Sequence, residues 1–510
     1  MLNLLGSARR LCDGLSRREF LRVGGLGGFG LGLGDYFAMP AAGAIPQPAH
    51  FGHAKACILL FLYGSPPQHE TFDPKPDAPA EVRGEIGSMS SVVPGLRIGE
   101  LLPRTARIMD QVTVVRSLTH PYPEHGVAYA LSGIPTYTPE LETRPRDSRH
   151  WPFIGSVVDY LEERRRNVGQ TFLSAARAGR QESLPHVPRN IALPWMLNSK
   201  TDLLVNAGPF AAFLGQAHDP LWTDFTGPGT RTVPHYTDSQ RQDFHDPFGG
   251  TLSSGRFQLS SEGRLRDDIP VERLNLRQSL LGQFELSRRQ IDASAQIMDR
   301  HRQRAYGLLT SNAVHQALDI GQESMALRER YGMTLFGQAC LAARRLVEAG
   351  SKFVTVFWDG YGQFANCAWD THNNHFPRLK EYLLPSFDLA YPTLIDDLRQ
   401  RGLLDETLVL CLSEHGRTPQ IDSRPKGAGR HHWSRVYSSV FAGGGMAKGC
   451  VVGSSDRLGG EVRDTPISPK DILATAFHLL GIDPHTTVPG PLGQPMPIAG
   501  DGEVRAELLG

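Results

Sequence analysis

Apolar residues are distributed along this chain in two patterns, short unbroken runs and longer stretches with helical spacing. Unbroken runs occupy residues 55–63, 353–357 and 407–412. Between the last two runs, apolar residues recur at three- and four-residue steps, the spacing of a helix that buries one face. A strand, a helix and a strand joined by so long a connection form a parallel pair, and strands that are apolar throughout are buried on both faces. The pattern predicts an α/β fold with a mostly parallel central sheet.

Two segments between these runs have a different composition. Residues 140–275 are rich in Arg, Pro, Gly, Asp and Ser, which predicts a loop-rich, irregular insertion. Residues 276–350 are predicted to be mostly helical, with breaks near glycines. We expect both segments to belong to one α/β domain that covers residues 45–510.

The first 44 residues have the features of an export signal. Ser16–Leu21 reads SRREFL, which resembles the twin-arginine signature, and a glycine- and leucine-rich uncharged run follows it. Ala42–Ala44 is a candidate A-x-A cleavage site. The uncharged run is too short and too rich in glycine to span a bilayer as a helix of the mature protein. We expect residues 1–44 to be removed after export to the periplasm or cell envelope.

The charge of the chain is balanced, because Lys plus Arg and Asp plus Glu each number 53. There is no net charge to attract the chain to nucleic acid or to an anionic membrane surface. We therefore expect no nucleic acid among its partners.

Acids and histidines follow the predicted strands at residues 353–357 and 407–412 and recur on a glycine-rich loop beyond them. The candidate ligands are Asp370, His372, Glu414, His415 and His432. Carboxylate oxygens and imidazole nitrogens that converge from separate elements bind divalent metals, and parallel strands bring their carboxyl ends to one edge. We predict a site for one or two ions of zinc, manganese or calcium, with His375 and His431 as supporting neighbours.

Three arginines lie beside these clusters in the sequence: Arg116, Arg417 and Arg430. A guanidinium in such a place either binds an anionic oxygen of the substrate with two hydrogen bonds or neutralises the acids around it. The sequence leaves both alternatives open.

Two hydroxyl side chains follow the predicted strand at residues 112–115, namely Ser117 and Thr119. A hydroxyl at a strand end is a candidate nucleophile when a metal lowers its pKa. A water activated by the same metal is an equal candidate.

Several segments resemble a known family. Residues 407–416, TLVLCLSEHG, are similar to the strand and Asp-His-Gly ligand motif of the alkaline phosphatase and sulfatase superfamily, with Glu414 in place of the aspartate. Residues 467–484, ISPKDILATAFHLLGIDP, resemble the C-terminal helix of sulfatases. The twin-arginine start and the segments Phe72–Pro76, Trp369–His372, Glu414–Pro419 and Gly429–Trp433 resemble, more specifically, a family of exported proteins of unknown function within that superfamily.

The resemblance implies an alkaline-phosphatase-like three-layer α/β sandwich, bound divalent cations and hydrolysis of phosphate or sulfate esters. Asp370 with His372 matches the metal-binding aspartate and histidine of the superfamily, although the spacing differs. Glu414 with His415 matches its Asp-His pair, and His432 matches its late metal-binding histidine.

The chain departs from the superfamily at two places. Its first strand ends in Tyr63-Gly64-Ser65 where metal-binding aspartates are usual, so His69, Glu70 or Asp73 would have to substitute. The Cys/Ser-x-Pro-x-Arg nucleophile motif of sulfatases is absent, and Pro123 and Glu124 align with the place of the nucleophile. The sequence therefore excludes a formylglycine sulfatase.

Three hypotheses remain. The first is an exported metal-dependent hydrolase of a phosphate or sulfate ester, with an anionic ester or glycan as substrate. The second is a non-catalytic envelope protein that binds an anionic glycan or a partner, which the missing nucleophile motif favours. The third is a metal-dependent mutase, which would transfer the group within one substrate rather than to water.

Overall fold

The computed structural model describes residues 50–122, 127–134, 138, 141, 144, 147–174, 187–194, 208–236, 241–260, 312–358, 368–423 and 427–510. Residues His50–Gly510 form one compact unit. The predicted export signal, the Pro123 and Glu124 pair and the predicted helices of residues 276–311 lie outside the described residues.

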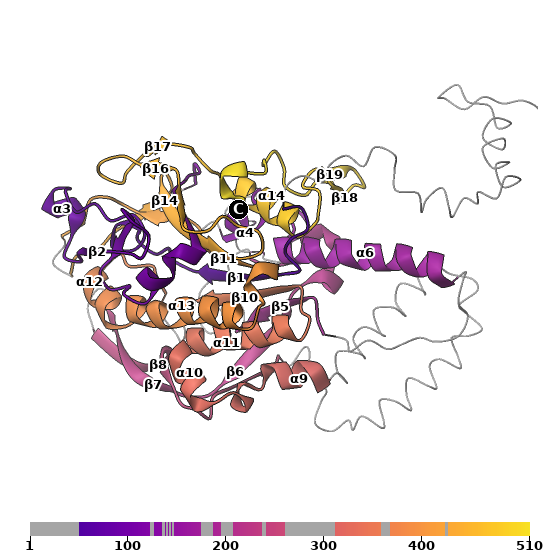
Figure 1. Cartoon of the computed structure of the whole chain (residues 1–510), viewed down its shortest axis with the longest axis horizontal. Coiled ribbons are helices and arrows are strands. Elements are labelled where there is room, and N and C mark those ends of the chain that lie inside the picture. Colours follow the sequence, from indigo (N-terminus) through magenta and orange to yellow (C-terminus); the bar gives the residue numbers. More distant parts are fainter. Residues whose placement is uncertain are drawn as a thin grey trace, which may run out of the picture. The chain divides into compact units, whose positions relative to one another are not determined.

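A nine-stranded sheet occupies the middle of this unit (Figure 1). In spatial order its strands are β15 (Cys450–Val452), β4 (Val112–Leu118), β14 (Tyr437–Ala442), β11 (Thr407–Leu412), β1 (Ala56–Leu62), β10 (Phe353–Trp358), β5 (Asn190–Leu193), β6 (Leu221–Thr226) and β9 (Arg256–Leu259). Only β14 and β9 pair antiparallel with their neighbours among these strands. The prediction of a mostly parallel α/β sheet is confirmed.

The sheet order differs from the sequence prediction at its centre. The strands at residues 353–357 and 407–412 were expected to form a parallel pair, but β1 lies between them and pairs parallel with both. Phe61 of β1 lies opposite Phe357 on one side and Leu412 on the other. The three strands therefore end at the same edge of the sheet.

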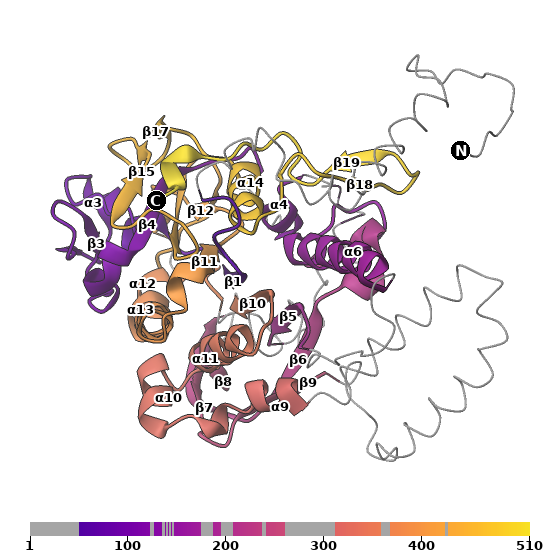
Figure 2. The same cartoon turned by 45° about the vertical axis from the view of Figure 1, so that its right-hand side comes forward.

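Helices cover both faces of the sheet, so the fold is a three-layer sandwich (Figure 2). Successive residues of β1 alternate between the two layers: Ile58 and Leu60 belong to one apolar cluster, and Leu59 and Phe61 belong to the other. Because both of its faces are buried, the strand reads as an unbroken apolar run in the sequence.

The first layer contains α9 (Asn312–Leu318), α10 (Met325–Tyr331), α11 (Leu335–Glu348), α12 (His375–Arg378) and α13 (Leu384–Gln400). A π-helical turn, Leu379–Leu383, joins α12 to α13, and a 3-10 helix, Thr105–Gln111, packs beside α13. The second layer contains α4 (Val127–Ser132), α6 (Ile154–Ser174) and α14 (Pro469–Leu479).

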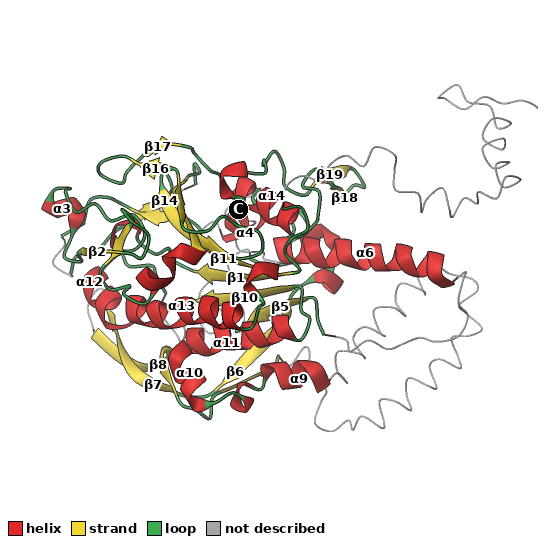
Figure 3. Ribbon diagram, in the orientation of Figure 1, coloured by secondary structure: helices red, strands yellow, loops and turns green. Residues whose placement is uncertain are grey.

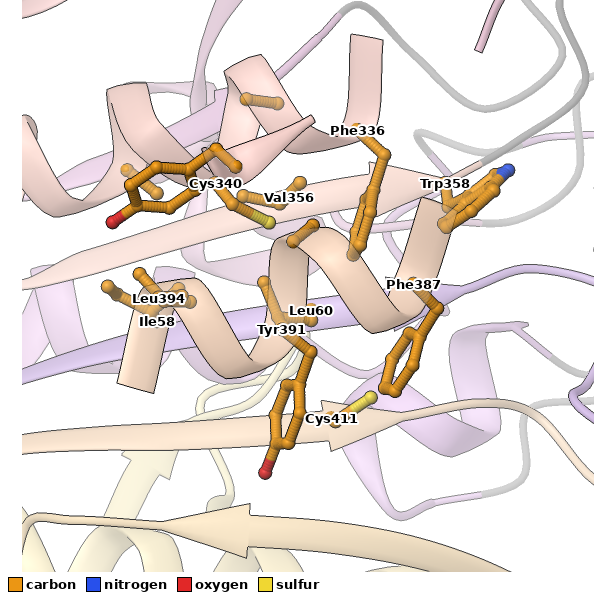
Figure 4. Packing of buried hydrophobic residues seen from close by; sticks show 14 of the residues in the cluster. Ile58, Leu60, Phe336, Cys340, Val356, Trp358, Phe387, Tyr391, Leu394 and Cys411 are labelled. Atoms are coloured by element: carbon orange, nitrogen blue, oxygen red, sulfur yellow. The ribbon is translucent and has the colours of Figure 1, made fainter. Parts of the chain in front are cut away.

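The core of the first layer is built from side chains of α11, α13 and the central strands (Figure 4). Trp358 at the end of β10 packs against Phe336 of α11, with ring centroids 4.4 Å apart, and against Trp369, 5.2 Å away. Both tryptophans are fully buried. This packing fixes the loop that begins after Trp369, where the first candidate ligand lies.

Smaller hairpins surround the sheet, as the ribbon diagram shows (Figure 3). They pair β2 (Ser88–Ser90) with β3 (Arg97–Gly99), β7 (Gly229–Tyr236) with β8 (Arg241–Thr251), β12 (Gly416–Arg417) with β13 (His432–Trp433), β16 (Ser454–Ser455) with β17 (Val462–Asp464), and β18 (Thr487–Pro489) with β19 (Pro495–Pro497). A short helix, α3 (Ala80–Arg83), precedes β2.

The segment predicted as a loop-rich insertion, residues 140–275, contains regular structure where it is described. It supplies α6 to the second layer and adds β5, β6 and β9 to the central sheet. Among the described residues, none of the helices combines the length and the hydropathy that a bilayer crossing requires.

Candidate metal centre

The predicted site residues lie at one edge of the central sheet. β4, β11, β1 and β10 run in the same direction, so their carboxyl ends share that edge, which is where open α/β sheets bind ligands. Glu414 and His415 follow β11 directly, and Asp370 and His372 lie between β10 and α12. His432 lies in β13 and contacts both Asp370 and His372.

Three of the five predicted ligands form a triangle of donor atoms. His372 Nε2 lies 3.0 Å from Asp370 Oδ1 and 3.0 Å from His432 Nε2, and His432 Nε2 lies 3.3 Å from Asp370 Oδ1. The side chains are 28% (Asp370), 37% (His372) and 20% (His432) exposed, so solvent and solutes reach the group. We call these three residues the donor group.

The donor group fits a divalent cation. Zinc bonds of about 2.0–2.1 Å in a tetrahedron place two ligand atoms roughly 3.3 Å apart, close to the three edges of this triangle. Hydrogen bonds alone serve the triangle poorly, because each Nε2 carries at most one proton. One carboxylate oxygen and two imidazole nitrogens are also a ligand set that borderline metals use.

Arg417 binds the donor group from its buried side. Its side chain is fully buried, and its Nη2 donates to Asp370 Oδ1. The same guanidinium donates to the carbonyl oxygens of Gly64, Ser65 and Trp369. In the β12–β13 hairpin, Arg417 lies opposite His432. One buried cation thus joins the turn after β1 to the loop that carries Asp370.

Gly64, the second residue after β1, permits the close approach of Asp370. Its φ is +89°, and a Cβ at this position would lie 2.2 Å from the Asp370 backbone nitrogen. Any side chain there would push Asp370 out of place. Glycine at this position therefore has a structural role.

Glu414 and His415, the other two predicted ligands, lie beside the donor group but outside it. The Glu414 carboxylate is fully buried and accepts hydrogen bonds from Gly64 N at 2.7 Å and from Ser413 Oγ at 3.0 Å. The His415 ring is buried and packs against His432 with centroids 4.4 Å apart, while its Nδ1 donates to Gly416 O at 2.9 Å. A ligand role for either residue stays a prediction.

Each of the three predicted arginines pairs with an acid. Arg417 pairs with Asp370; Arg430 Nη2 lies 2.6 Å from Glu70 Oε1; Arg116 Nε lies 3.5 Å from Asp73 Oδ1. Arg417 and Arg430 are fully buried. These contacts correspond to the neutralising alternative, and contact of any of the three with a substrate anion stays a prediction.

A buried network of charges lies under the loop that carries Asp370 and His372. His375 Nε2 lies 3.3 Å from Glu70 Oε2, and His375 Nδ1 lies 2.7 Å from the Thr371 hydroxyl. Burial raises the pKa of Glu70, but Arg430 and His375 outweigh that effect and hold the pKa at about 2. Burial lowers the pKa of His375. The network anchors Thr371 between the two predicted ligands.

His69, Glu70 and Asp73, the proposed substitutes for first-strand ligands, have partners elsewhere. His69 Nε2 contacts Leu458 O at 2.8 Å, and burial lowers the pKa of His69 to about 4. Asp73 pairs with Lys75 at 3.0 Å and accepts from the Ser455 hydroxyl. None of the three belongs to the donor group among the described residues.

The two predicted nucleophiles differ in access. Ser117 is fully buried, and a Cβ on Gly453 would lie 1.9 Å from its hydroxyl oxygen, so the backbone of Gly453 covers it. Thr119 is half-buried, and its N–H donates to Ile467 O at 3.0 Å. His120, next in the chain, reaches Glu414 O at 2.6 Å, and burial lowers the pKa of His120 to about 4.

Asp422 is a residue of the site that the sequence analysis missed. Its Oδ2 accepts from His431 Nε2 at 2.9 Å, and His431 Nδ1 lies 2.8 Å from His372 Nδ1. The signal was available only in part: His431 was expected as a neighbour of the ligands, but nothing near Asp422 in the sequence marks it.

A second set of acids and a histidine lies beside the beginning of β5, at the sheet edge opposite to the donor group. Asp159 and Glu163 are one turn apart on α6, and His218 Nδ1 lies 2.8 Å from Asp159 Oδ2. Arg189 Nε lies 2.8 Å from Asp159 Oδ1, and Arg189 Nη2 lies 3.5 Å from Glu163 Oε2. Each of these close contacts joins a donor to an acceptor, so the set is best described as an ion-pair network.

Comparisons with known proteins give a family and a set of distant structures. The family described as "Protein of unknown function (DUF1501)" matches residues 54–509. Among curated proteins, no sequence matches the chain.

The similar solved structures include Ps i-CgsB, with a TM-score of 0.35, 12% identity, and coverage of 84% of this chain and 72% of that one. They also include the lipoteichoic acid synthase LtaP from Listeria monocytogenes (0.32, 10%, 86% and 75%). A third is the PsFucS1 sulfatase from Pseudoalteromonas sp. (0.34, 10%, 84% and 68%). Likeness of this degree says nothing about the chemistry of the site.

Proposed function

The chain belongs to the DUF1501 family of proteins of unknown function, and we propose that it is an exported, metal-dependent hydrolase of the alkaline phosphatase and sulfatase superfamily that acts on a phosphate or sulfate ester. The observation that carries the proposal is the donor group, whose three atoms lie 3.0–3.3 Å apart at the carboxyl edge of a parallel sheet. The resemblance of residues 407–416 and 467–484 to that superfamily supplies the reaction class.

In this proposal Asp370, His372 and His432 hold the cation. A divalent cation bound there supplies Lewis acidity, which polarises an ester oxygen and lowers the pKa of a water molecule. Arg417 already balances the charge of Asp370, and imidazole ligands are neutral. The loaded centre therefore keeps a positive charge, which favours an anionic ester or glycan as the substrate.

The buried residues around the donor group provide rigidity. Arg417 and Glu414 bind the same turn after β1, through the Gly64 carbonyl and the Gly64 N–H respectively. A site held by such buried contacts keeps its ligands in place without reorganisation. Because Gly453 covers Ser117, the proposal favours water over Ser117 as the nucleophile, with Thr119 as the alternative hydroxyl.

The proposed location is the periplasm or cell envelope, reached by the twin-arginine route. Its support is the Ser16–Leu21 motif together with the candidate cleavage site at Ala42–Ala44. Fusion of residues 1–44 to a reporter that matures only when exported folded would test it, with Arg17→Lys plus Arg18→Lys as the matched control.

The hydrolase proposal is tested by metal content and turnover together. Mature protein, purified without chelator, is analysed by inductively coupled plasma mass spectrometry and assayed on nitrophenyl phosphate, nitrophenyl sulfate and sulfated or phosphorylated glycans. We expect one or two equivalents of zinc, manganese or calcium, and turnover that chelation abolishes and metal restores. Turnover that persists after complete removal of metal would contradict the proposal.

A non-catalytic binding protein for an anionic glycan or a partner is the second candidate. The observation that favours it is the cover of Gly453 over Ser117, combined with the internal acid partners of Arg116, Arg417 and Arg430. Saturable, metal-dependent binding of a sulfated glycan without product release would establish this candidate in place of the hydrolase.

A further inference from the structure

A series of hydrogen-bonding groups leads from Asp422 through His431 to the donor group. Asp422 Oδ2 lies 2.9 Å from His431 Nε2, and His431 Nδ1 lies 2.8 Å from His372 Nδ1. The other nitrogen of His372, Nε2, is a vertex of the donor triangle. His431, which Asp422 binds, therefore contacts the far side of one candidate ligand.

The contacts between Asp422, His431 and His372 favour particular proton positions on the two imidazole rings. A carboxylate only accepts, so Asp422 favours the tautomer of His431 that carries its proton on Nε2. In that tautomer His431 Nδ1 is an acceptor, and the 2.8 Å contact is completed when His372 carries its proton on Nδ1. His372 Nε2 is then left with a lone pair directed at the triangle.

The backbone brings these residues together by close packing. Asp422 and Gly429 exchange two backbone hydrogen bonds, of 2.8 and 3.0 Å, and His431 N donates to the Thr418 hydroxyl at 3.0 Å. A Cβ on Gly429 would lie 1.8 Å from the His372 carbonyl oxygen. Gly429, which pairs with Asp422 and lies two residues before His431, thus packs directly on the His372 backbone.

We propose that Asp422 and His431 are positioning residues, which select the tautomer of His372 that offers Nε2 to a divalent cation. The inference rests on the proposed function in taking His372 as a ligand. Partners of this kind, which bind the second nitrogen of a ligating histidine, fix its ring and raise its basicity as a donor.

The first test measures zinc affinity. Asp422→Asn keeps the shape of the side chain but removes the charge that favours a proton on His431 Nε2. We expect zinc to bind this variant about 10- to 100-fold more weakly than the wild type, the usual cost of losing such a partner. The matched control is Asp405→Asn, which removes the same charge from an exposed aspartate paired with Lys448, before β11 at the opposite edge.

The second test reads the tautomer without metal. Long-range proton–nitrogen spectra of metal-free protein labelled at histidine nitrogen are recorded at about pH 8, above the ordinary imidazole pKa. His372→Gln and His431→Gln assign the signals. We expect His372 to carry its proton on Nδ1 in the wild type, and to divide it between both nitrogens in Asp422→Asn.

The outcomes separate this inference from the proposed function. A wild-type His372 protonated on Nε2, or an Asp422→Asn variant with unchanged tautomer and zinc affinity, would overturn the positioning role. Failure of the wild type to bind zinc or any other divalent metal would overturn the proposed function, whereas the metal-free tautomer measurement tests the selection by itself.

Discussion

Two groups of carboxylates and histidines lie at opposite edges of this sheet, and only one of them suits a metal. The donor group lies at the carboxyl ends of the strands, and the second group, Asp159, Glu163 and His218, lies beside the beginning of β5. Residue types alone do not distinguish them, since each contains aspartate, histidine and a neighbouring arginine.

The two groups differ in which atoms are in contact. In the second group each close contact joins a donor to an acceptor: His218 with Asp159, and Arg189 with both acids. In the donor group one edge joins two ring nitrogens of the same kind, 3.0 Å apart. Two like atoms at that distance need a proton or a cation between them. The atoms in contact, rather than the composition of the cluster, therefore distinguish the two groups.

Removing Asp159 should have the largest effect of the changes considered. Asp159→Ala leaves Arg189 without its closest carboxylate, in a site where Asp159 is fully buried. Breaking a buried ion pair in this way costs about 3–5 kcal/mol, which urea unfolding would measure. The zinc stoichiometry should stay as in the wild type, and a loss of bound metal would show that the second group, too, is a metal site.

The complementary experiment removes one side chain of the donor group. His432→Ala should weaken zinc binding by roughly 3 kcal/mol, or about 150-fold, because apparent binding energies of about 10–16 kcal/mol are shared among four ligands. The free energy of unfolding without metal should change little, since the side chain is partly exposed. The matched control is His485→Ala, an exposed histidine near the C-terminus. Equal zinc affinity in both variants would contradict the assignment of His432.

Glu70 differs from the acids of both groups, because it is a buried acid that stabilises the fold beside the site through its charge. Its pKa falls from 4.5 to about 2 on folding, so it stabilises the fold fully above about pH 4.5, and this stabilisation is lost as the pH falls through about 2. The shift corresponds to a contribution on the order of 3 kcal/mol. Glu70→Gln should remove it near neutral pH and flatten the decline of the urea midpoint below about pH 4.5. A parallel decline in both proteins would refute the role of Glu70.

The elements predicted best are those with a local signal. The unbroken apolar runs predicted β1, β10 and β11. Residues 467–484, which were expected to resemble a helix of sulfatases, contain α14, where Ser468 and Asp471 form a capping box. β5 and β6 have weaker patterns, being short or mixed with polar residues. Their place in the sheet depends on pairing with distant strands, which a single sequence does not display.

The candidate site was predictable as a location rather than as a set of contacts. Parallel strands bring Asp370, Glu414 and His415 to one edge whatever their order. The direction of the Glu414 side chain depends on β1 lying next to β11, because its partner is the Gly64 N–H, 350 residues earlier. The pairing of Arg430 with Glu70 spans 360 residues. Such long-range contacts decide which acids remain available to a cation.

Ser117 offers the smallest expected effect on stability and the most direct way to identify the nucleophile. Its hydroxyl is fully buried, has no hydrogen-bond partner among the described residues, and lies under Gly453. Ser117→Ala removes a buried polar group that gains nothing from its surroundings, so the free energy of unfolding should stay within about 1 kcal/mol of the wild type or rise slightly. Turnover of whichever ester proves to be a substrate should be unchanged, with Thr119→Val as the comparison at the accessible hydroxyl. Loss of turnover in Ser117→Ala, with zinc still bound, would mean that the loop of Gly453 moves aside and that the hydroxyl, not water, attacks the ester.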